Sequence, residues 1–97
     1  MLQQFGVALI EQQRVVVLTN TLFHNIDVLL VALIKPQTKA ALLTQFQIPV
    51  TIEEQASCID LLDIASVSAK RLKTTEINLQ SYRQQIKAGL DLMIDGF

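Results

Sequence analysis

The chain has 97 residues, of which 51% are hydrophobic and only 18% charged, and its formal net charge is −1. This length predicts a single domain over residues 1–97, and so much hydrophobic sequence favours a packed core over disorder. The slightly acidic balance argues against a nucleic-acid partner, because neutralising phosphates requires a clustered basic surface.

The longest apolar segment, residues 15–34, predicts the first and central helix. At 100° per residue, one stripe of this helix would carry Val15, Leu18, Leu22, Ile26, Leu29 and Leu33. A second apolar band lies beside it, so the helix would be apolar around most of its circumference. Such a helix must be covered by several neighbours. The uninterrupted apolar run, residues 28–34, is too short to span a membrane.

Residues 14–18 allow a second interpretation, because their β-branched side chains also suit a strand that pairs with residues 7–10. The connection between them, Glu11-Gln12-Gln13, lacks the Gly, Asn or Asp that tight hairpin turns favour. The same residues have good helix propensity. We therefore expect one helix, continuous or bent, that ends before Pro36.

The second half of the chain predicts further helices. A short one would cover residues 39–46, and the sequence Thr51-Ile52-Glu53-Glu54 matches a capping box that starts the next helix at Ile52. From Cys58 to Phe97 a heptad-like pattern places apolar residues at ten of twelve positions, which suits helices packed lengthwise. A break at residues 73–75 is favoured over one continuous helix, and Gly96 would close the last helix.

These elements predict an all-α fold, an antiparallel bundle of about four helices. A small chain with so few charged residues leaves apolar surface exposed as a lone monomer. We therefore expect the bundle to be completed by homodimerisation.

The residues that could carry chemistry are few and scattered. His24 is the only histidine and Cys58 the only cysteine, and each is expected to be structural. The acidic pairs, Asp60 with Asp63 and Glu53 with Glu54, are expected to form solvated helix faces rather than a cation site. We therefore expect no catalytic residues, no metal and no cofactor.

The function predicted is that of a non-enzymatic protein–protein interaction module of the adaptor, chaperone or immunity type. It would bind itself, and possibly another protein, but no nucleic acid and no membrane. The interface is expected at Leu22, Leu29, Leu30, Leu33, Leu79, Ile86, Leu90 and Met93.

Two alternatives stay open. One is a carrier that holds a small apolar ligand between helices. The other is a helix-turn-helix regulator over residues 40–56, although carboxylates at the start of its second helix would repel DNA. The N-terminal residues lack the positive region of a secretory signal, so a cytoplasmic location is expected.

Overall fold

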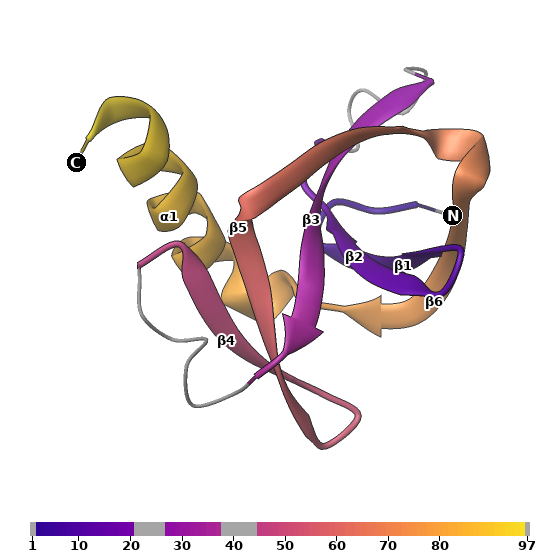
Figure 1. Cartoon of the computed structure of the whole chain (residues 1–97), viewed down its shortest axis with the longest axis horizontal. Coiled ribbons are helices and arrows are strands. Elements are labelled where there is room, and N and C mark those ends of the chain that lie inside the picture. The colour runs from indigo at the N-terminus through magenta and orange to yellow at the C-terminus, as the bar shows by residue number, and fades with distance from the viewer. Residues whose placement is uncertain (1, 21–26, 38–44, 97) are drawn as a thin grey trace.

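The computed structural model describes residues 2–20, 27–37 and 45–96. These residues form one antiparallel sheet, strongly bent, and a C-terminal helix that lies against one side of it (Figure 1). The strands are β1 (Gly6–Ile10), β2 (Gln13–Val17), β3 (Val28–Pro36), β4 (Gln47–Ile52), β5 (Gln55–Ser68) and β6 (Leu72–Asn78). Two 3₁₀ turns, η2 (Ala69–Arg71) and η3 (Gln80–Tyr82), follow β5 and β6, and α1 covers Arg83–Asp95. The strand order is β4-β5-β3-β2-β1-β6.

The prediction of an all-α bundle is therefore wrong. The segment expected to be its central helix contains β2 and β3, with residues 21–26 outside the described part of the chain. Both faces of these strands are covered: Val16 packs into one hydrophobic cluster, and Val15 and Val17 pack into another. A strand buried on both faces is apolar at consecutive positions, which is the same signal that a fully buried helix gives.

The hairpin that the sequence argument rejected is present. β1 and β2 pair antiparallel from Val7 opposite Val16 to Ile10 opposite Gln13, and the connecting turn is Glu11-Gln12. Glu11 adopts a φ of 56°, the left-handed region that turns normally fill with glycine or asparagine. The free energy gained by packing the valines on both faces outweighs the cost of the unfavourable turn residue Glu11. The absence of Gly, Asn or Asp from the turn was therefore a misleading argument against the hairpin.

The capping box is also wrong. Glu53 and Glu54 form the turn of the β4–β5 hairpin, with φ values of 50° and 66°. The helix expected from Ile52 is replaced by β5, and the helix-turn-helix interpretation fails with it, because residues 47–56 are a hairpin. The short helix expected at 39–46 falls largely on residues 38–44, which lie outside the described residues.

The heptad-like pattern runs through β5, η2 and β6 before it reaches α1, so most of it has no helical meaning. Only its last third is helical. Gly96 ends α1 with a φ of 80° and its N–H donates to the carbonyl of Leu92, so the predicted closure of the last helix is confirmed. No helix in the described part of the chain is long and apolar enough to cross a membrane.

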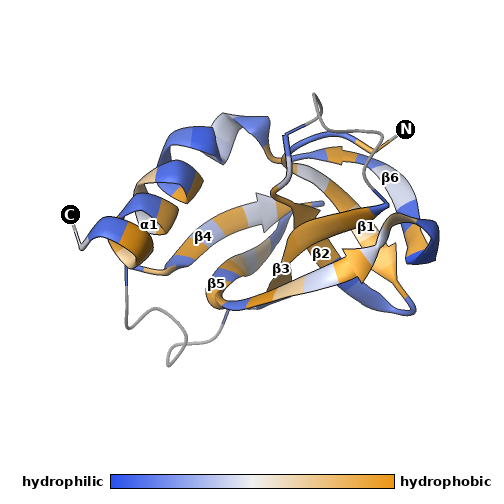
Figure 2. Cartoon of the chain, turned by 90° about the horizontal axis from the view of Figure 1, so that it is seen from above, coloured by the Kyte–Doolittle hydropathy of each residue, from blue (hydrophilic) through white to orange (hydrophobic). Residues whose placement is uncertain are grey.

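Two hydrophobic clusters lie on opposite faces of the sheet. The larger one is covered by α1, and Ile86 at its centre is fully buried. The smaller one lies inside the bend of the sheet and includes Val15, Val17, Leu29 and Val31. Figure 2 shows the consequence for α1, whose outward side is hydrophilic while the strands beneath it are hydrophobic. α1 is held along the sheet by the packing of its inner side against the larger cluster.

Candidate protein-interaction site

The C-terminal half of α1 carries exposed apolar side chains. Figure 1 shows this half extending beyond the strands, so it loses the support of the sheet. Met93 is 38% exposed and Ile94 is 78% exposed. Removing apolar side chains from water lowers the free energy of the system. A projecting helix end with such side chains is therefore a candidate contact for another protein.

The apolar character continues from α1 onto the neighbouring strands. A cleft of about 370 Å³ lies beside the helix, and Leu18, Leu90 and Ile94 are among its lining residues. Leu18 donates its N–H to the carbonyl of Leu30, whose side chain is 48% exposed. We call these residues together with Met93 the α1 apolar surface: Leu18, Leu30, Leu90, Met93 and Ile94.

Cations and one carboxylate border this surface. Arg83, Lys87 and Asp91 line the same cleft on the α1 side. None of the three has an ion pair among the described residues. An apolar centre with a charged rim is the usual composition of a protein–protein contact.

A bulge in β5 shapes the other side of the helix. The register shifts between Ala32 opposite Ile64 and Leu33 opposite Asp60, so three residues of β5 loop out. Leu61 turns inward and is 1% exposed, whereas Leu62 turns outward and is 58% exposed. Bulges commonly re-aim side chains near functional surfaces. Here the bulge turns Leu62 to the surface while Leu61 packs against α1 at Gly89.

Asp60 holds this bulge in shape. Its carboxylate accepts a hydrogen bond from the N–H of Leu62 at 3.0 Å and one from Lys35 Nζ at 2.8 Å. Lys35 also pairs with Asp63 at 3.0 Å. The hydrogen bond that Lys35 donates to Asp60, followed by the one that it donates to Asp63, raises the pKa of Lys35 above its usual value of 10.5. Asp60 and Asp63 were predicted to form a solvated helix face. In the structure they lie on β5 and bind Lys35 of β3, so they join the two strands.

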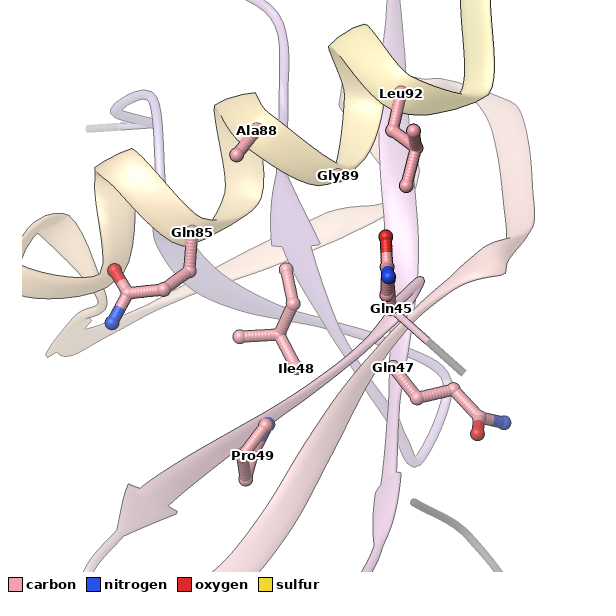
Figure 3. A pocket seen from close by; sticks show the side chains of 8 residues that line it. All are labelled: Gln45, Gln47, Ile48, Pro49, Gln85, Ala88, Gly89 and Leu92. Atoms are coloured by element: carbon pink, nitrogen blue, oxygen red, sulfur yellow. The ribbon is translucent and has the colours of Figure 1, made fainter. Parts of the chain in front are cut away.

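A second cleft, of about 310 Å³, lies on the β4 side of the helix. Figure 3 shows Ile48 rising from β4 toward α1, with Gln85 and Leu92 above it on the helix and Gln47 directed away. Gly89 permits this close approach, because a Cβ there would stand 2.6 Å from Leu61 Cδ1. The cleft is shallow and its polar groups are neutral amides.

The interface residues predicted from sequence are divided between core and surface. Leu29, Leu79 and Ile86 are buried, at 6%, 2% and 0% exposure. Leu33 is half-buried against the smaller cluster, and Leu90 is half-buried against the larger one. Leu30 and Met93 are exposed, and Leu22 lies outside the described residues.

The exposed residues that the prediction missed are Val28, Leu62 and Ile94. Ile94 follows Leu90 by four residues, the same spacing that joins Ile86 to Leu90, so the sequence pattern does not mark it as exposed. Leu62 gives no sequence signal either, since its exposure depends on the β5 bulge.

Cys58 and His24 are the other residues that the sequence offers for chemistry. Cys58 is buried in β5 at 2% exposure, and burial, followed by the charge of Asp60, raises the pKa of its thiol. A buried protonated thiol suits a packing role. His24 lies outside the described residues. Within the part of the chain that the structure describes, no three His, Cys, Asp or Glu side chains gather as a metal site would require.

The comparisons with known proteins decide the family. The family model described as CcdB protein matches residues 8–96, which is nearly the whole chain. The chain belongs to the CcdB family. A search among curated proteins finds no match.

CcdB proteins are toxins of toxin–antitoxin systems, and they act by binding other proteins, namely gyrase and an antitoxin. They form dimers and are not a family of enzymes. The expectation of a protein-interaction module is therefore confirmed at this level. The adaptor, chaperone and immunity types have no support, and a ligand site between helices has no place beside the single α-helix of the described residues.

Proposed function

We propose that this chain is a cytoplasmic toxin that binds gyrase as a homodimer and is neutralised by a cognate antitoxin. The observation that carries the proposal is the CcdB family match over residues 8–96. The α1 apolar surface supports it from the physical side. It offers exposed aliphatic side chains on a helix whose other side is anchored by the fully buried Ile86.

Within this surface, the end of α1 is the proposed contact for the target. Ile94 is the most exposed large hydrophobic residue of the described chain, so nearly all of its side chain is free to be buried by a partner. Complete burial of such a side chain contributes roughly 1.5–3 kcal/mol. Losing it would weaken binding by roughly tenfold to a hundredfold.

The test of this contact is an inducible growth assay combined with purified gyrase. Expression of the chain should arrest bacterial growth, and the purified protein should bind gyrase in a pull-down. Ile94→Asp should weaken gyrase binding by at least about tenfold and relieve the growth arrest. Gln84→Asp, which introduces the same charge at an exposed position of the same helix, should leave both effects intact. Absence of gyrase binding by the unaltered chain would refute the function. Full activity of Ile94→Asp would refute the contact.

Self-association is proposed at the sheet side of the same surface, around Leu30. Of the positions predicted from sequence, Leu30 and Met93 are exposed and available to a second copy. Leu29 is a poor probe of a dimer, because a charge at its buried position would unfold the monomer itself. Leu30 avoids this difficulty, since half of its side chain already meets solvent.

Light scattering behind size exclusion measures this directly. The unaltered chain should elute with twice the monomer mass, and Leu30→Asp should shift the mass toward that of the monomer while circular dichroism stays unchanged. Ala56→Asp, at an exposed position of the β4–β5 hairpin, is the matched control and should stay dimeric. A monomeric unaltered chain, or a dimeric Leu30→Asp variant, would contradict the proposal.

A further inference from the structure

The two ends of the sheet differ in whether another strand can add to them. β4 and β6 are the outermost strands of the described sheet. An outermost strand exposes backbone N–H and C=O groups that another extended segment can pair with, unless the protein blocks them.

The β4 edge is blocked. Pro49 has no N–H to donate, and the N–H of Thr51 already donates to the hydroxyl of Tyr82 at 3.1 Å. Like Pro49 and Thr51, Gln47 directs its backbone groups away from β5, and it also has an interaction of its own. Proline and capped amides are the usual means by which proteins close a sheet edge.

Among residues 2–20, 27–37 and 45–96, nothing blocks the β6 edge at Thr74 in this way. The two-residue turn of the β1–β2 hairpin directs the backbone groups of Ile10 and Ala8 toward β2, so those of Leu9 and Val7 face β6. The Thr75 hydroxyl does donate to the carbonyl of Val7 at 2.6 Å, as this orientation requires. Leu9 therefore pairs with Lys73, and the backbone N–H and C=O of Thr74, one residue on, point away from the sheet.

The charge at this edge selects the partner. Lys70 and Arg71 immediately precede β6 and Lys73 lies on it, and all three are exposed. Of these three cations, only Arg71 has an ion pair within the described residues, a 3.5 Å contact with Glu11. Glu76, near the far end of β6, is the one carboxylate on the strand itself. The beginning of the edge is thus a concentration of positive charge in a chain that is slightly acidic as a whole.

We propose that β6 is a docking edge for an extended acidic segment of a partner protein, which adds as a further strand beside residues 72–76. Backbone pairing at Thr74 would supply the register, and Lys70 and Lys73 would attract the acidic side chains. The same cations repel the β6 edge of a second copy, so they disfavour self-pairing at this place. The site is separate from the α1 apolar surface, because β6 and the C-terminal end of α1 lie on opposite sides of the molecule (Figures 1 and 2).

The probe is a fluorescently labelled synthetic peptide of alternating glutamate and threonine, followed by fluorescence anisotropy with the full chain. The peptide should bind, and binding should weaken as salt is added, because exposed charges are screened. The same peptide with lysine in place of glutamate should not bind. An NMR titration should place the shifted amides at residues 72–76.

Two pairs of variants separate the backbone and charge contributions. Thr74→Pro removes the outward N–H and should abolish binding, whereas Thr74→Val keeps this N–H and should bind as the unaltered chain does. Proline is tolerated where an edge N–H faces solvent, so the fold should persist, as unchanged amide shifts in α1 would verify. Lys70→Glu with Lys73→Glu should weaken binding about tenfold, while Lys87→Glu on α1 should not.

Three results would overturn the inference: no binding of the glutamate peptide, equal binding of the lysine peptide, or undiminished binding to Thr74→Pro. Each is independent of gyrase binding and of dimerisation. Failure of the docking edge would therefore leave the proposed function untouched, and the reverse also holds.

Discussion

Gly89 offers a sharp test of how α1 is held on the sheet. In an ordinary helix, replacing an internal glycine by alanine stabilises by about 1 kcal/mol. At position 89 the added methyl would stand 2.6 Å from Leu61 Cδ1, which is far inside van der Waals contact. Leu61 is 1% exposed and packed in the larger hydrophobic cluster, so its side chain has little room to move away.

The magnitude follows from two opposing effects. Overpacking a well-packed core costs about 1–3 kcal/mol. Subtracting the helix-propensity gain of about 1 kcal/mol leaves Gly89→Ala destabilised by about 0–2 kcal/mol. For a domain of this size, a loss of 1 kcal/mol lowers Tm by about 4–8 °C.

Urea unfolding of four proteins measures the effect: the unaltered chain, Gly89→Ala, Leu61→Val and the double variant. Leu61→Val alone should cost about 0.5–1.5 kcal/mol through the lost methylene. Because valine has no Cδ, Gly89→Ala should become stabilising in that background, by up to about 1 kcal/mol. If Gly89→Ala stabilises both backgrounds equally, the contact with Leu61 does not set the position of α1 and the reasoning is refuted.

Two further predictions concern the hairpin turn and the ion pairs of Lys35. Glu54→Gly should raise the free energy of unfolding by about 1 kcal/mol, because glycine relieves the strain of φ 66°. Glu54→Ala should give no such gain, and equal effects of the two variants in urea unfolding would contradict this reasoning. Lys35 has a pKa raised above 10.5 in the folded state by Asp60 and Asp63, so its contribution is complete below pH 10.5 and is lost as the pH rises through the folded pKa. The stability difference between the unaltered chain and Lys35→Met should therefore stay constant between pH 5 and 8 and shrink at alkaline pH; a difference that already shrinks between pH 5 and 8 would exclude this origin.

The local signals that succeeded in the sequence are those whose cause is local. Gly96 was expected to end the last helix, and it does so with a positive φ that glycine adopts at no steric cost. The amphipathic spacing of Ile86, Leu90 and Met93 likewise matches α1. These features depend on a few consecutive residues and so can be read without knowledge of the fold.

The signals that failed are those that long-range packing overrides. Glu53 and Glu54 favour a helix start by composition, yet they form a hairpin turn because β4 and β5 each bury apolar side chains against the sheet. Of the residues predicted as an interface, Leu29 and Ile86 lie in the core because apolar character does not distinguish a protein's own interior from a partner's surface.

The sequence alone determined that this chain has enough apolar residues, 51%, to form a core and only 18% charged residues to cover its surface. The tertiary structure decided that the apolar valines belong to strands covered on both faces, and that Leu30, Leu62 and Ile94 reach the outside. The physical reason is that composition fixes how much apolar surface a chain must bury. Which apolar residues stay on the surface is settled only when strands far apart in the sequence pair and, among the described residues, leave Met93 and Ile94 at the helix end exposed.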